Sequence, residues 1–330
     1  MEFNPGLLQQ NSLALFVLCG AHNLNLILAD AAKGSLDATC YFGYLTKVFT
    51  LFSVSPQRWQ VLIKHVSISL KSWSDVRWER RVKNVEAIRY QPAQIREALL
   101  KLRECATDPV IKVEIQSLAE EVGSYRFVIC SIVWYDILSK IQHVSKLKQS
   151  ITMQLGVAVD LLKKTRDHIV SYRNTGFADA LTTAKEICEA MNVDTVLKQK
   201  RLKTKKCHFS YKCADEPVSD ALKRMDTTFF NVVMDTAISS LNERFKTLGE
   251  VNGKFKVLLG FTDMSDKDIV DHCQTLNNTL THEGHSDIDG RELAMELQSV
   301  PDLPSKRRQQ WIFSPSCMKR NLLKYSRTCG

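Results

Sequence analysis

The chain has 330 residues and an ordinary globular composition, with 44% hydrophobic and 25% charged residues. Its 10 cysteines are scattered without a CxxC pair, which argues against a secreted disulfide framework and favours reduced thiols in a nuclear or cytoplasmic protein. The net charge of +9 is compatible with a polyanionic partner. We see no secretory signal and no membrane-length apolar window, so we expect no membrane association.

The first structured stretch combines a strand pattern with a helix pattern. Leu13–Leu18 is a short apolar run that predicts a buried strand, and the period then changes at Cys19. A helix is predicted over about Ala21–Ala32, with His22 in its first turn. Cys19 and His22 could be half of a zinc site, but no partner pair has suitable spacing. We therefore favour a structural junction, with Cys19 as a small buried residue and His22 bonded to a backbone carbonyl.

Helical periodicity continues through most of the chain, because only 13 Gly and 8 Pro interrupt it. Ser55-Pro56, Pro92 and Asp108-Pro109 predict helix starts, and Tyr125–Leu147 has the densest apolar positions. A short strand is possible near Trp73–Val76. The other predicted helical stretches are residues 37–54, 78–87, 151–173, 176–191 and 218–248. The chain is therefore expected to be mainly α.

The later part of the chain carries a basic run and then weaker patterns. Residues 198–206 (KQKRLKTKK) are either a disordered basic loop or a segment that contacts phosphates or serves as a nuclear address. Its candidate DNA contacts are Lys200, Arg201, Lys203, Lys205 and Lys206.

Cysteine and histidine follow this run without forming a convincing metal site. Cys207, His208 and Cys213 have irregular spacing and lack a fourth ligand, so no metal is expected there. Beyond them, residues 250–262 are predicted to connect two helices, Ser265 to begin the second, and 282–290 to form a loop.

Three motifs, taken in order, resemble the hAT superfamily of DNA transposases and the host proteins derived from them. They are Cys19-x-x-His22 before Leu24-Asn25-Leu26, Arg77-Trp78 within residues 71–81, and Ser240-Leu241-Asn242-Glu243-Arg244-Phe245. The similarity is greatest to the transposase-like region of MYM-type zinc-finger proteins and covers roughly residues 10–262.

The resemblance implies a domain organisation that begins part-way into the family fold. Residues 1–90 would be a remnant of an RNase H-like α/β core with one or two strands, and residues 91–262 a large all-helical insertion domain. A C-terminal helical segment at 263–300 and a poorly ordered tail at 301–330 would follow.

Transposases of this family hold two metal ions with two Asp and one Glu, and both Asp precede the Cys-x-x-His motif. Here Glu2 is the carboxylate ahead of Cys19. Glu243-Arg244-Phe245 resembles the segment of the final Glu, but Lys246 follows it and its setting is helical. The resemblance therefore implies a fragment truncated at its N-terminus, without the acidic triad, catalytic metal or cofactor, and hence not an enzyme.

Several functions stay open at this point. The first is a catalytically inactive transposase-derived module in the nucleus or otherwise the cytoplasm. It would bind nucleic acid, in particular DNA, or protein, either a second copy of itself or a chromatin factor. The second is a helical protein-interaction scaffold with no DNA role, and the third is part of an active transposase whose catalytic Asp strands are missing from this chain. Trp78 either stacks on an unpaired base beside Arg77 or packs in the core with Val82, and the sequence alone favours packing.

Overall fold

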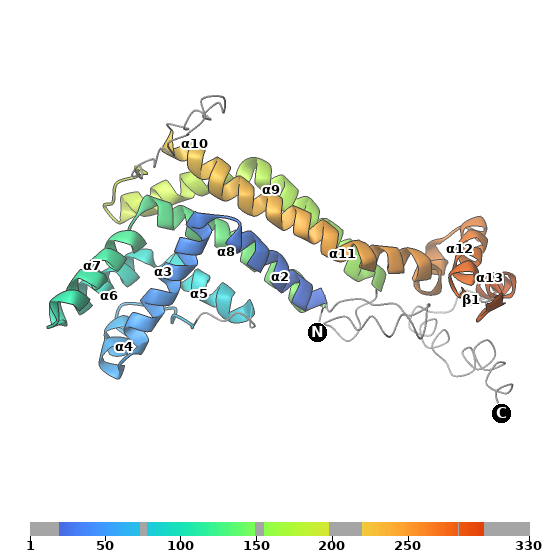
Figure 1. Ribbon diagram of the computed structural model, residues 1–330, viewed down its shortest axis with the longest axis horizontal. Helices are drawn as coiled ribbons and strands as arrows, with labels where there is room; N and C mark the ends of the chain where they lie inside the picture. Colours follow the sequence, from blue (N-terminus) through green and yellow to red (C-terminus); the bar gives the residue numbers. More distant parts are fainter. Residues whose placement is uncertain (1–19, 73–77, 149–154, 198–219, 283, 300–330) are drawn as a thin grey trace, which may run out of the picture. The chain divides into compact units, whose positions relative to one another are not determined.

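The computed structural model describes residues 20–72, 78–148, 155–197, 220–282 and 284–299 (Figure 1). These residues are mainly helical, which confirms the mainly α part of the predicted fold class. The strands expected at Leu13–Leu18 and Trp73–Val76 lie outside the described residues, so the RNase H-like remnant and the predicted domain boundaries stay predictions.

Two compact units make up the described chain. The larger one, called the helical unit, contains the described residues of 20–149 and 164–243. The other, called the C-terminal unit, contains those of 150–163 and 244–330. The helical unit begins with α2 (Gly20–Lys33), α3 (Leu36–Ser53), α4 (Pro56–Ile63), α5 (Trp78–Tyr90), α6 (Pro92–Cys105), α7 (Pro109–Val122) and α8 (Tyr125–Lys148).

Local capping signals place the predicted helix starts correctly. The Ser55 hydroxyl accepts a hydrogen bond from the Arg58 backbone N–H at 3.2 Å, and Pro56 occupies the first turn of α4. The Asp108 carboxylate accepts from the Val110 N–H at 2.8 Å at the start of α7. These bonds satisfy N–H groups that have no partner inside the helix.

Helix α8 forms the centre of the helical unit, as its apolar density predicts. Trp134 and Phe127 are almost fully buried. The Trp134 ring lies 4.7 Å from that of Phe42, and the Phe127 ring 5.0 Å from that of Tyr41, so α8 packs against α3 through aromatic pairs. By length and composition α8 could also cross a membrane, but 67% of its most apolar window is buried inside the protein. A buried core helix passes that test equally well.

The chain then forms two long helices that lie side by side (Figure 1). The elements are α9 (Leu155–Ala190), α10 (Ala221–Met225), a π-helical turn η1 (Asp226–Phe230) and α11 (Asn231–Gly260). Within the helical unit, the Arg173 guanidinium of α9 forms an ion pair with Asp235 of α11, with Nη2 and Oδ2 2.9 Å apart.

Two sequence-based boundaries are wrong. The predicted break near residues 174–175 is absent, because α9 continues through Gly176. The Tyr172 ring lies where a side chain at Gly176 would stand, 2.5 Å from an ideal Cβ, so the glycine serves packing instead of ending the helix. Residues 250–260 are also helical and not a connection, since Val257 is fully buried and anchors the end of α11.

The C-terminal unit has a small core of its own. Its elements beyond α11 are a 3₁₀ turn η2 (Phe261–Asp263), α12 (Asp266–Thr279), β1 (Thr281–His282), β2 (His285–Ser286) and α13 (Gly290–Ser299). Ser265 begins α12 as predicted and accepts from the Asp268 N–H at 3.2 Å. Gly290 allows α13 to approach α12 closely, because an ideal Cβ there would lie 2.9 Å from the Cys273 carbonyl oxygen. The predicted loop at 282–290 instead contains a short antiparallel hairpin except for its first residue, Thr281.

Candidate functional site

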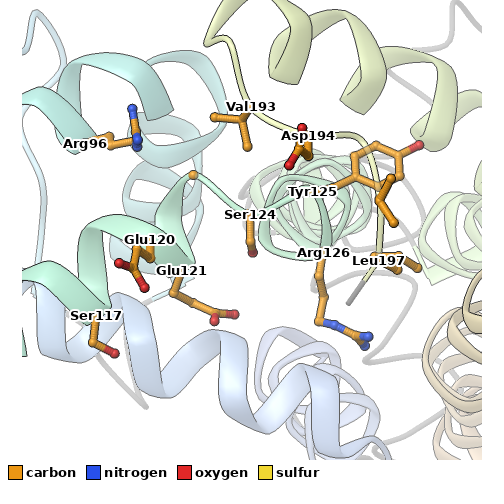
Figure 2. Close-up of a pocket in the computed structure, with 12 residues that line it drawn as sticks. Arg96, Ser117, Glu120, Glu121, Ser124, Tyr125, Arg126, Val193, Asp194 and Leu197 are labelled. Carbon is orange, nitrogen blue, oxygen red and sulfur yellow. The ribbon is translucent and has the colours of Figure 1, made fainter. Parts of the chain in front are cut away.

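A polar pocket of about 420 Å³ opens in the helical unit where α7 meets α8 (Figure 2). Figure 2 shows Arg96 and Arg126 on opposite sides, with Ser124 between them. The polar side chains that line it include Arg96 of α6, Glu120 and Glu121 of α7, Ser124 and Arg126 at the start of α8, and Asp194 beyond α9.

The end of α9 builds one wall of this pocket. Asn192 adopts a left-handed conformation, with φ of 51°, and the Val193 N–H donates to the Cys188 carbonyl at 2.9 Å. This is the Schellman arrangement that ends a helix and reverses the chain. The following residues reach the pocket, where Leu197 is buried. The Tyr125 hydroxyl donates to the Leu181 carbonyl at 3.2 Å and ties α8 to α9 beside it.

The charges around the pocket have mixed sign. Arg126 forms an ion pair with Asp37 of α3 at 3.0 Å, and both side chains are largely buried. Arg96 lies against the α7–α8 turn, because an ideal Cβ on Gly123 would stand 2.9 Å from its Cδ. With two guanidinium groups and three carboxylates, the described lining suits a polar ligand that carries both charges. The described lining includes no His or Cys.

A second polar group lies in the same unit, around Asp136 on α8. The Tyr172 hydroxyl of α9 donates to Asp136 Oδ2 at 2.8 Å. Burial raises the pKa of the Asp136 carboxyl above its usual range, although the Tyr172 hydrogen bond and the charges of Arg89 and His168 oppose this shift. Burial also raises the pKa of Tyr172, and it lowers the pKa of His168, whose ring stacks on Tyr172.

The raised pKa of Asp136 has a consequence for stability. The native protein holds the Asp136 proton more tightly than the unfolded chain does, so stability falls as pH rises from the usual carboxyl pKa through the raised value. Asp136→Asn removes the charge and keeps an oxygen that can accept from Tyr172. We expect this variant to lose less stability than wild type between acid and neutral pH, as measured by urea unfolding. Asp160→Asn, at an exposed position of α9, is the matched control. An unchanged pH dependence in Asp136→Asn contradicts the prediction.

Most residues proposed from the sequence lie outside the part of the chain that the structure describes. This holds for Cys19, Arg77, Lys200, Arg201, Lys203, Lys205 and Lys206. Trp78 is the first residue of α5, but its side chain is not among those described. His22 lies in the first turn of α2 with an exposed side chain. Its proposed hydrogen bond to a backbone carbonyl stays a prediction.

The structure also locates the carboxylate that most resembles a family catalytic residue. Glu243 is exposed in the middle of α11, a helical setting that matches the sequence-based expectation. Across the described ranges, no three His, Cys, Asp or Glu side chains are grouped so that they could hold a metal ion together.

Sequence reasoning missed both polar sites of the helical unit. A signal for the second was visible: Tyr135-Asp136 interrupts the dense apolar pattern of Tyr125–Leu147, where a carboxylate needs a partner. The pocket had no comparable signal, because its lining comes from α6, α7, α8 and the segment after α9.

Charge is distributed unevenly along the chain. Residues 261–299 contain nine Asp or Glu and two Lys or Arg, a net charge of −7. Residues 10–260 have a net charge of +11, and residues 300–330 one of +6. At the beginning of α5, directly after Trp78, the side chains of Arg80 and Lys83 are exposed. The net charge of residues 10–260 is thus more positive than that of the whole chain.

Comparisons with known proteins give no match: a scan against family models, a search of curated proteins and a search of solved structures each returned none.

Proposed function

We propose that this chain is a catalytically inactive, hAT transposase-derived module that binds nucleic acid. The observation that carries the proposal is the net charge of +11 over residues 10–260, together with the exposed Arg80 and Lys83 beside the Arg77-Trp78 motif. Phosphates attract such a surface without regard to sequence, and an aromatic residue among cations adds affinity for unpaired bases. A nuclear location agrees with this role.

The first test is direct binding. Purified chain is titrated into a labelled DNA hairpin and a labelled duplex, and fluorescence anisotropy is followed between about 50 and 200 mM salt. Saturable binding that weakens steeply with salt supports the proposal. Absence of binding to either DNA at the lowest salt contradicts it.

The second test concerns catalysis. We expect the 330-residue chain not to nick or join DNA with Mg²⁺ or Mn²⁺, because Glu243 is exposed on α11 and Glu2 is the carboxylate ahead of Cys19. The measurement is conversion of supercoiled plasmid to open circles by pure protein. Nicking that requires metal and disappears when a single Asp or Glu is replaced would favour the alternative, an active transposase.

The mixed-charge pocket at the α7–α8 junction favours a second candidate, a helical scaffold that binds protein. A protein partner offers peptide groups and side chains of both charges, which suit a lining that contains Arg96 and Arg126 as well as Glu120 and Asp194. One experiment distinguishes the two candidate functions. If Arg96→Ala leaves DNA binding unchanged, the pocket is not part of the DNA surface, whereas a scaffold without a DNA role shows no DNA binding in either form.

A further inference from the structure

The hairpin of the C-terminal unit places two imidazoles opposite each other. Strand β1 pairs antiparallel with β2, with Thr281 opposite Ser286 and His282 opposite His285. Two residues separate the strands, and the second, Gly284, has φ of +82°, which glycine adopts without strain. Residues that face each other in such a pair project from the same side of the ribbon.

Hydrogen bonds and apolar contacts fix this hairpin on the end of α12. The Thr281 hydroxyl donates to the Asn277 carbonyl at 2.7 Å, and the Ser286 hydroxyl donates to Asn277 Oδ1 at 3.0 Å. Leu280 and Ile288, on either side of the hairpin, pack against the core of the C-terminal unit. The two strands are therefore held in register before any ligand binds, which lowers the entropy cost of binding one.

The spacing of the pair suits a shared metal ion. Directly opposed residues have Cβ atoms about 4.5–5.5 Å apart, and metal–imidazole bonds to zinc are about 2.0–2.1 Å long. Both side chains are exposed, so an ion can reach them from solvent. Two imidazoles across one tight turn can then ligate the same ion from two sides.

The surrounding charge favours a cation. The hairpin lies within residues 261–299, which carry a net charge of −7, and Asp287 and Asp289 follow it directly. Asp289 is already used as a cap, since its Oδ1 accepts from the Arg291 and Glu292 N–H groups at 2.8 and 3.1 Å. Carboxylates alone attract Mg²⁺ or Ca²⁺, whereas a pair of imidazoles selects Zn²⁺, Ni²⁺ or Cu²⁺.

We propose that this hairpin is a binding site for a divalent transition-metal ion of the Zn²⁺ class, held by the imidazoles of His282 and His285. No third His, Cys, Asp or Glu joins them among the described residues, which leave out Glu283. The bound ion cross-links β1 to β2 and stabilises the C-terminal unit, because it binds the folded hairpin better than the unfolded chain.

The test is calorimetric titration of Zn²⁺ into the full chain and its variants. We expect His282→Ala and His285→Ala each to weaken this site by about tenfold or more, and the double variant to lose it. His272→Ala is the matched control, because it removes an imidazole from α12 within the same acidic segment. The cysteines are identical in all variants, so zinc bound by thiols contributes equally to each titration. The difference between wild type and a variant therefore reports on the histidines.

Two results overturn the proposal. One is an unchanged number and affinity of zinc sites in the double variant, with circular dichroism showing that it is folded. The other is Ca²⁺ binding as tight as Zn²⁺ binding and insensitive to both histidine substitutions, which assigns cation binding to the acidic side chains alone. A zinc-dependent rise in the melting temperature of wild type that is absent from the double variant supports it independently.

Discussion

Replacing Phe230 by alanine is expected to lower the free energy of unfolding by about 3–5 kcal/mol, the range for a large aromatic residue removed from a packed core. The Phe230 side chain is fully buried at the end of the π-helical turn. Its ring lies 5.7 Å from the Tyr172 ring and 5.4 Å from the Phe177 ring, both on α9. The substitution therefore leaves a cavity between the two long helices and removes the support of the tyrosine that binds Asp136.

Urea unfolding of the full chain measures this loss, with Leu222→Ala as control. Leu222 lies on α10, eight positions earlier, and is partly exposed, so its truncation is expected to cost much less. Phe230→Leu keeps most of the volume and should fall between wild type and Phe230→Ala. A loss below about 1 kcal/mol for Phe230→Ala shows that the π-helical turn does not anchor α11 on α9.

The same turn illustrates what the sequence could predict. The apolar spacing over 218–248 predicts helix, and the structure is helical from Ala221 onward. The apolar spacing does not predict the π-helical turn at Asp226–Phe230, because the extra residue in that turn is accommodated by contacts with α9. Helix starts at Ser55, Asp108 and Ser265 were predictable, since each depends on a cap and its own first turn.

The features that the sequence did not predict depend on how side chains pack, within one helix or between segments. The predicted break near residues 174–175 is absent because the Tyr172 ring occupies the space beside Gly176, which a local sequence pattern does not show. The hairpin at 281–286 has two residues in each strand, too few for an alternating pattern. The pocket requires the chain to turn back at Asn192, which a single residue in a left-handed conformation accomplishes. Local sequence patterns thus predicted most of the helices, whereas the candidate sites form only where those helices pack together.

Removing the charges of the basic run is expected to have the largest effect on DNA binding. The logarithm of duplex affinity falls linearly with the logarithm of salt concentration, and each phosphate that the protein neutralises contributes about −0.9 to the slope. Losing five such contacts would therefore make the slope shallower by about 4–5. The variant replaces Lys200, Arg201, Lys203, Lys205 and Lys206 by alanine. Anisotropy titrations over a series of salt concentrations measure the slope.

A control with the same change in net charge shows whether position matters. Five exposed lysines elsewhere are replaced by alanine, namely Lys33, Lys47, Lys64, Lys163 and Lys164. If the slope becomes shallower by the same amount in both variants, the chain binds DNA by its overall charge, and residues 198–206 are a solvated loop that makes no particular contact with DNA.

Trp78 is the other proposed contact with DNA, and its substitution distinguishes stacking on a base from packing in the core. If Trp78 stacks on an unpaired base beside Arg77, Trp78→Ala should weaken hairpin binding by about 1–3 kcal/mol and duplex binding much less. If it packs against the buried Val82 on α5, the same substitution should cost several kcal/mol of stability instead. Melting temperature and hairpin affinity are therefore measured on the same protein. A large fall in melting temperature, with unchanged affinity in the folded fraction, identifies Trp78 as a core residue and leaves the basic run as the proposed DNA contact.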